Sequence, residues 1–210
     1  MLEKLRGAWS WIHRAGLAVV LLMALVYPYF GLLTKTEGFQ FGAFQRALSA
    51  ARAAGEPSPW LTAMKVWTLD GGAYFTNVFP DDMAAAVWLR SAPDGNMVEA
   101  TRQDASYHGE IALVSTYSGL PTILGWPGHE SQWRGTYDGL PERMADIQRL
   151  YETSNWDEAQ AILIKYSIRY VYVGTQERLN YHVNDDKFKT HLEGVFSQGQ
   201  VVIYEVPAVP

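Results

Sequence analysis

Residues 15–34 form a run of twenty amino acids without a single Asp, Glu, Lys, Arg or His. An α-helix rises about 1.5 Å per residue, so a run of this length extends for about 30 Å, the hydrocarbon thickness of a bilayer. Aromatic residues of the type found at membrane interfaces lie on both sides of the apolar core, at Trp9, Trp11, Tyr27, Tyr29 and Phe30. The run predicts one transmembrane helix, with the lipid bilayer as its partner.

The basic residues predict how this helix is oriented. Lys4, Arg6 and Arg14 precede the run, whereas Lys35 is followed closely by Glu37. The positive-inside rule then places residues 1–14 in the cytoplasm and the rest of the chain outside, as a single-pass protein of the plasma membrane. A buried core helix and a cleaved signal peptide are the alternatives. A signal peptide has a shorter apolar core and small residues at its cleavage site, but bulky residues close this run.

Charge and cysteine content exclude several classes of protein. The chain has 210 residues and no cysteine, which excludes disulfides, thiolate zinc sites and cysteine nucleophiles. Four of the 17 Lys and Arg residues and one of the 22 acids lie in residues 1–35, which leaves 13 bases and 21 acids, a net charge of −8, for the rest. Nucleic-acid binding needs clustered basic residues, so no nucleic-acid partner is expected. No motif indicates a metal or a cofactor.

The remaining sequence predicts a connector followed by an α/β domain. Residues 35–60 form the connector, with one amphipathic helix whose apolar positions are Phe41, Phe44, Leu48 and Ala51. In residues 61–207, helices are expected from Pro80, with Ala84, Val87 and Trp88 on one face, and over 140–151, 156–166 and 186–192. Strands are expected over 96–100, 121–125, 168–173, 194–197 and 201–206. This order predicts an extracytoplasmic α/β domain with a mixed sheet and a terminal antiparallel hairpin.

The densest group of polar and aromatic residues is residues 125–135, which we interpret as a glycine-punctuated loop. It carries Trp126, His129, Glu130, Gln132, Trp133 and Arg134. A helical zinc-protease motif would need a second histidine where Trp133 stands, so that motif fails. Indole rings stack on the apolar faces of sugars, while the polar side chains can bind hydroxyl or phosphate groups. The alternative is structural: the tryptophans anchor the loop and Glu130 pairs with Arg134.

Asp70 is a second candidate contact because it precedes Gly71 and Gly72, where a backbone could approach a ligand closely. The alternative is that Asp70 caps its own backbone turn. The paired carboxylates at residues 81–82, 157–158 and 185–186 are each explained by helix capping. No catalytic residue is identified.

Four segments together resemble one family. They are residues 68–74 (TLDGGAY), 80–82 (PDD), 115–135 (STYSGLPTILGWPGHESQWRG) and 166–174 (YSIRYVYVG). Over residues 15–207 the chain resembles the C-terminal portion of the YYY-type multi-spanning membrane proteins, which are similar to GT-C glycosyltransferases. The resemblance implies that a bundle of membrane helices precedes the final span and the extracytoplasmic domain in such proteins. It also implies that the early external loop with the catalytic acid is absent from this chain.

The expected function is a membrane-anchored domain that helps a glycosyltransferase-like protein bind a lipid-linked sugar or its acceptor, without catalysis of its own. A polyprenyl-linked sugar and a multi-spanning membrane subunit are the expected partners. The alternative is an assembly module that docks on partner membrane helices through Trp67, Trp88 and the tryptophans of residues 125–135. That alternative predicts that Trp126 and Trp133 are buried, with no open cleft beside His129. An anchored hydrolase lacks a nucleophile or carboxylate pair with suitable spacing.

Overall fold

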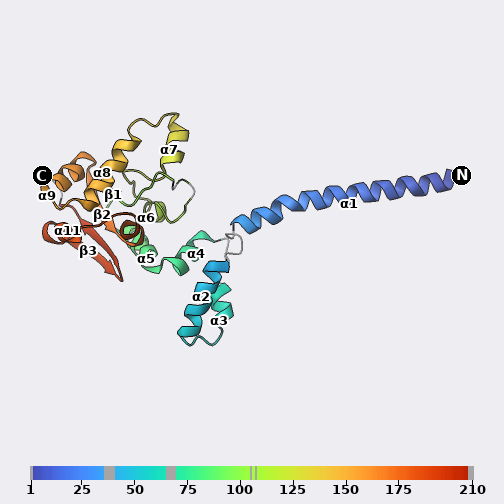
Figure 1. The fold of residues 1–210 in the computed structure, drawn as a ribbon, viewed down its shortest axis with the longest axis horizontal. Helices are drawn as coiled ribbons and strands as arrows, with labels where there is room; N and C mark the ends of the chain where they lie inside the picture. Colours follow the sequence, from blue (N-terminus) through green and yellow to red (C-terminus); the bar gives the residue numbers. More distant parts are fainter. Residues whose placement is uncertain (1, 36–40, 65–69, 105, 107, 208–210) are drawn as a thin grey trace. The chain divides into compact units, whose positions relative to one another are not determined.

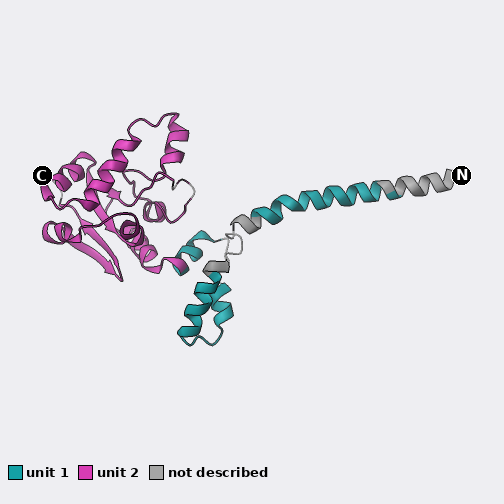
Figure 2. Ribbon diagram, in the orientation of Figure 1, with its two compact units in different colours: residues 1–77 teal, residues 78–210 magenta. Residues whose placement is uncertain are grey.

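The computed structural model describes residues 2–35, 41–64, 70–104, 106 and 108–207. It divides into two compact units, residues 1–77 and residues 78–210 (Figure 2). Trp67, one of the tryptophans considered for docking, lies outside the described residues.

The long helix α1 (Leu2–Lys35) begins the first unit (Figure 1). Its stretch His13–Gly31 is long and apolar enough to cross a membrane, and none of it is buried in the structure. Among the described residues it is the one such helix. A core helix of a soluble domain would be mostly buried, so the structure does not support that alternative. A helix that is apolar on every side is stable when it is surrounded by lipid.

The first unit also holds two helices that pack on each other, α2 (Phe41–Ala53) and α3 (Pro59–Met64), and a further helix, α4 (Gly71–Val78), begins near its end. The predicted amphipathic helix is confirmed as α2. Phe44 and Leu48 are buried and pack with Ala63 of α3, and the ring of Phe44 lies 5.1 Å from that of Trp60. The apolar face of α2 is therefore covered within its own unit.

The second unit is built on the predicted mixed sheet, in the order β1 (Asn96–Val98), β2 (Ile168–Val173), β4 (Val201–Glu205) and β3 (Glu193–Gln198). β1 and β2 are parallel, while β2–β4 and β4–β3 are antiparallel, which confirms the terminal hairpin. The strand expected over 121–125 is wrong in extent, because only Thr122 makes a bridge, to Met97. The chain turns away there into the segment that leads to α7.

The described residues of the second unit form seven helices: α5 (Pro80–Leu89), α6 (Leu113–Ser118), α7 (Pro127–Arg134), α8 (Leu140–Glu152), α9 (Trp156–Lys165), α10 (Thr175–Asn180) and α11 (Asp185–His191). The expected helices correspond to α5, α8, α9 and α11. The face expected for α5 is wrong at Val87, which is 53% exposed, whereas Trp88 packs against Tyr170 as expected. Met83, Ala86 and Leu89 are buried as well. The short helices α3, α4, α6, α7 and α10 are absent from the sequence prediction.

Helices lie on both faces of β2, as its apolar sequence predicts. On one face, Val171 and Val173 belong to the core that α8 and α9 complete with Leu150 and Leu163. On the other face, Tyr170 meets Trp88 of α5 with ring centroids 6.4 Å apart. A strand buried on both faces needs apolar side chains at successive positions, which explains the run of residues 168–173.

Candidate functional site

An open cleft of about 530 Å³ lies in the second unit, next to the edge of the sheet where Thr122 bridges β1. Its lining comes from α6, the segment before α7, α7 itself and one side chain of α8. The residues are Ala112, Ser115, Thr116, Thr122, Ile123, Gly125, Trp126, His129, Glu130, Trp133, Arg134 and Arg143. Five of the six residues expected from the 125–135 segment thus line one cleft.

The segment interpreted as a loop is a helix, α7, and this correction explains which residues meet. Pro127 stands in its first turn, where a missing N–H costs nothing, and Gly135 ends it at a φ of 72°. In a helix, residues three to four positions apart share a face, so His129, Glu130 and Trp133 can line one cleft. Gln132 does not line it, and its side chain is exposed.

Trp126 and His129 form the aromatic wall of the cleft. The indole Nε1–H of Trp126 donates to the carbonyl of His108 at 3.3 Å, which fixes the ring plane. The imidazole of His129 meets that ring edge to face at a centroid distance of 5.6 Å. Trp133 is 87% exposed, so its ring is available to stack on a ligand.

This exposure bears on the assembly-module alternative. That hypothesis expected Trp126 and Trp133 to be buried and no cleft to open beside His129. Trp126 is half-buried, but the expectation is wrong for Trp133, which is exposed, and for the cleft, which is open.

Glu130 and Arg134 pair across one turn of α7, as the structural alternative expected. Their closest oxygen and nitrogen atoms lie 2.9 Å apart. Glu130 also accepts a hydrogen bond from the backbone N–H of Gly125 at 3.3 Å, which ties the helix to the segment before it. The Arg134 side chain is 52% exposed, so its guanidinium can bind an anion while it keeps this pair.

Arg143 of α8 is a cleft residue that the sequence prediction missed. Its Nη1 donates to the carbonyl of Ile123 at 2.7 Å, which holds the guanidinium at the cleft wall. It stands one position before Met144, at the border of the apolar stripe of α8. Such a flanking cation is common on amphipathic helices, so periodicity alone could not identify it. With Arg143, the cleft holds two guanidinium groups against the single carboxylate of Glu130.

Asp70 is not part of this cleft. It belongs to the first unit, where its carboxylate Oδ1 accepts from the backbone N–H of Ala73 at 3.1 Å. That geometry is the cap of α4, whose first residue is Gly71. The capping alternative for Asp70 is therefore confirmed.

Two buried glutamates, also missed by the sequence prediction, line a small cavity of about 10 Å³ behind α6. Glu99 accepts from the backbone N–H groups of Val114, at 3.0 Å, and Ser115. Glu177 accepts from Ala100, at 2.6 Å, and Gly174, at 2.9 Å. Burial raises the pKa of Glu99 to about 7 and that of Glu177 to about 8. The cavity has room for about one water molecule, so these groups are structural.

Asp82 belongs to the same buried region, and this corrects its expected role as a helix cap. α5 has no side-chain cap. The carboxylate of Asp82 instead accepts from the Tyr172 hydroxyl and from the N–H and hydroxyl of Thr175. It therefore joins α5 to the end of β2.

No group of three or more His, Asp or Glu side chains in the described part of the chain could hold a metal ion. Comparison with known proteins adds no relative. No family model matches the chain, and no curated protein or solved structure matches it either. The likeness to the YYY-type membrane proteins therefore stays a prediction from the sequence.

Proposed function

We propose that this chain is a membrane-anchored extracytoplasmic domain that binds the sugar phosphate head of a lipid-linked sugar for a glycosyltransferase-like membrane protein. The single observation that carries the proposal is the open cleft in which Trp126, Trp133, Arg134 and Arg143 meet. The exposed ring of Trp133 and the half-buried ring of Trp126 suit the apolar face of a sugar, and two guanidinium groups suit a phosphate.

The charge pattern supports an anionic group in this cleft. Residues 36–210 carry a net charge of −8, yet the cleft holds Arg134 and Arg143 against Glu130. A local excess of cations on an acidic domain favours an anionic ligand at that place. The same cleft offers the hydroxyl groups of Ser115 and Thr116 to sugar hydroxyls.

The placement in the cell is part of the proposal. α1 crosses the plasma membrane once, with residues 1–14 in the cytoplasm and the cleft on the extracytoplasmic side. The basic residues Lys4, Arg6 and Arg14 before the span support this orientation. The domain positions the ligand, and a multi-spanning partner supplies the chemistry.

A binding measurement tests the proposal. The full chain in lipid nanodiscs is titrated with glucose 1-phosphate and mannose 1-phosphate, and empty nanodiscs serve as the reference. Arg134→Gln removes one guanidinium from an exposed position, so we expect binding to weaken by roughly tenfold to a hundredfold.

The matched control is Arg149→Gln. Arg149 is 51% exposed, against 52% for Arg134, and it lies on α8 outside the cleft lining. It should bind the sugar phosphates as the unmodified chain does. Equal effects of the two substitutions, or no binding at all, would contradict the proposal.

A further inference from the structure

Helices α2 and α3 form a hairpin in which each helix covers one face of the other. They lie side by side (Figure 1), and Phe44 and Leu48 of α2 pack with Ala63 of α3. Gly55, at a φ of 69°, lies in the turn between them, and its N–H donates to the carbonyl of Arg52 at 3.1 Å. Each helix therefore has a second face that its partner helix does not cover.

The uncovered face of α3 is apolar. Trp60 is 58% exposed, Leu61 is 66% exposed and Met64 is 47% exposed, and α3 contains no charged residue. Successive residues of a helix are about 100° apart, so these three side chains lie within about 100° of its circumference. Ala63, which packs on α2, lies outside this arc.

The uncovered face of α2 is polar by comparison, because Gln45, Arg46 and Ser49 are exposed on it. The hairpin is thus amphipathic across its thickness, with α2 on the polar side and α3 on the apolar side. A helix that faces water normally exposes polar side chains, so the α3 side suits an apolar environment.

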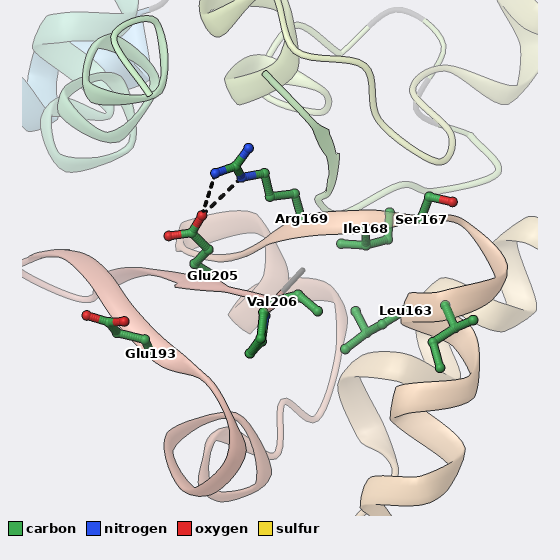
Figure 3. Close-up of a pocket in the computed structure, with 9 residues that line it drawn as sticks. Leu163, Ser167, Ile168, Arg169, Glu193, Glu205 and Val206 are labelled. Carbon is green, nitrogen blue, oxygen red and sulfur yellow. Dashed lines mark hydrogen bonds and ion pairs between the residues drawn. The ribbon is translucent and has the colours of Figure 1, made fainter. Parts of the chain in front are cut away.

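The face of α3 differs from the other apolar positions on the surface. Apart from α1 and α3, each helix exposes at most one large apolar side chain among those that the structure describes. They are Val87, Trp133, Ile164 and Leu179. Ile164 borders a hollow of about 630 Å³ (Figure 3), but Leu163 and Ile168 in the same hollow are buried in the core. Single exposed apolar side chains are ordinary, whereas three within one short helix indicate a contact surface.

The covalent chain keeps this face close to a membrane that α1 crosses. Residues 36–40 connect α1 to α2, and the six peptide links from Lys35 to Phe41 reach at most about 22 Å. α1 extends four residues beyond the span His13–Gly31, which adds about 6 Å. Phe41 therefore lies within about 28 Å of the end of the span. Docking on a tethered surface is effectively intramolecular, so even a small apolar face can suffice.

We propose that the face of α3 formed by Trp60, Leu61 and Met64 lies in the interfacial layer of the bilayer that α1 crosses. The inference rests on the part of the proposed function in which α1 spans the membrane. One side of the Trp60 ring packs near Phe44, at a centroid distance of 5.1 Å, while more than half of the side chain is exposed. An indole with an apolar body and an N–H group suits the headgroup layer, and Leu61 and Met64 suit the acyl chains beneath it. The membrane then holds the chain at two places, the span and the hairpin.

Spin labels test this contact, because the chain has no cysteine of its own. A nitroxide is attached to Met64→Cys in the full chain, in nanodiscs of phosphatidylcholine. Oxygen concentrates in lipid and a polar nickel chelate stays in water, so we expect oxygen to relax this label more than the chelate does. Ser49→Cys is the matched control, since it is exposed on the polar side of the same hairpin, and it should show the reverse order. Leu22→Cys, in the middle of the span, provides the reference for a label inside the bilayer.

A substitution then measures how much the apolar face contributes. Leu61→Glu, with the label kept at Met64→Cys, removes one buried leucine and adds a carboxylate. We expect the ratio of docked to free hairpins to fall at least about tenfold, and the accessibility of the label to the chelate to rise toward that of Ser49→Cys. Leu179→Glu is the control, because it makes the same change at a 73% exposed position of α10 and should leave the label unchanged. Equal effects of the two substitutions would contradict the contact.

The outcomes separate this inference from the proposed function. If the chelate reaches Met64→Cys as readily as Ser49→Cys while Leu22→Cys behaves as a label in lipid, the inference is refuted and the span stands. If Met64→Cys is shielded from oxygen and chelate alike, protein covers the face, and the inference is equally refuted. If the chelate reaches Leu22→Cys, the proposed span fails and the inference fails with it. The titration with sugar phosphates decides on the cleft independently of all three outcomes.

Discussion

Glu177→Gln tests whether the buried carboxyl network sets the pH dependence of stability. Glu177 is 1% exposed, and its two oxygens accept from Ala100 and Gly174. Burial raises its pKa to about 8, mainly because the charged form loses its hydration. An unfolded glutamate has a pKa of about 4.3. Across about pH 6 to 8 the folded chain therefore holds a proton that the unfolded chain has already released.

The sign and size of the effect follow from linkage. Because the folded chain binds more protons, the free energy of unfolding decreases as the pH rises through the folded pKa. The contribution of Glu177 to the free energy of unfolding is fully present below about pH 4 and is fully lost above about pH 9. Integration from about pH 6 to about pH 9 with a folded pKa of 8 gives a loss of about 3 kcal/mol from Glu177. Glu99, with a pKa of about 7, adds a smaller loss in the same direction.

Glutamine cannot titrate, so the variant should lack most of this slope. At about pH 6 the free energy of unfolding of the variant should be lower than that of the unmodified chain by about 1–3 kcal/mol. The NH₂ group of the glutamine replaces a carboxyl oxygen that accepts a hydrogen bond from a backbone N–H, so that N–H loses its acceptor. As the pH rises, the difference from the unmodified chain should shrink, since only the unmodified chain must then bury a charge. The two stability curves should meet between about pH 7 and pH 9.

Amide hydrogen exchange of residues 168–173 is the assay, because β2 is the buried centre of the second unit and exchanges only when that unit opens. The full chain is measured in nanodiscs at several pH values, after correction for the intrinsic exchange rate at each pH. Glu193→Gln is the control, since it removes the same charge from an exposed position on β3. It should keep the slope. Parallel curves for Glu177→Gln and the unmodified chain would refute the reasoning.

Two further predictions concern the core and the membrane orientation. The hydroxyl of Tyr151 is buried and donates to the carbonyls of Tyr172, at 2.8 Å, and Val98, so Tyr151→Phe should lower the free energy of unfolding by about 1–3 kcal/mol in urea titrations. An unchanged urea midpoint would contradict that role. The chain has no cysteine, so Leu179→Cys provides one exposed thiol in the second unit. A membrane-impermeant maleimide should label it in intact cells and should label Lys4→Cys only after permeabilisation; the reverse pattern would overturn the proposed orientation.

Periodicity predicted the elements whose stability comes from one apolar face. α8 and α9 were predicted because each buries apolar side chains at helical spacing, and β2 was predicted because its residues form one apolar run. The short helices have no such signal. α7 was mistaken for a loop because its eight residues contain Pro127, Gly128 and mostly polar side chains, although proline in the first turn and Gly135 after the last are themselves boundary signals.

The candidate site was predictable only where its residues are neighbours in the sequence. Trp126, His129 and Arg134 were found because one segment carries them. Arg143 comes from another helix, and its place at the cleft depends on a bond to a backbone carbonyl that leaves no trace in the sequence. Glu99 and Glu177 lie 78 positions apart, and each accepts from backbone groups distant in sequence. Such contacts arise from tertiary structure alone.

The buried Glu99 also stabilises the first turn of α6, which forms part of the cleft wall. Ala112, at the start of α6, has a φ of 58°, a conformation that costs energy for a residue with a side chain, and Ala112 lines the cleft. The carboxylate of Glu99 accepts from the N–H groups of Val114 and Ser115 in the first turn of the same helix, which compensates for this cost. Both of its oxygens are thereby occupied, so Glu99 supports the cleft wall to which Ser115 belongs and does not itself line the cleft.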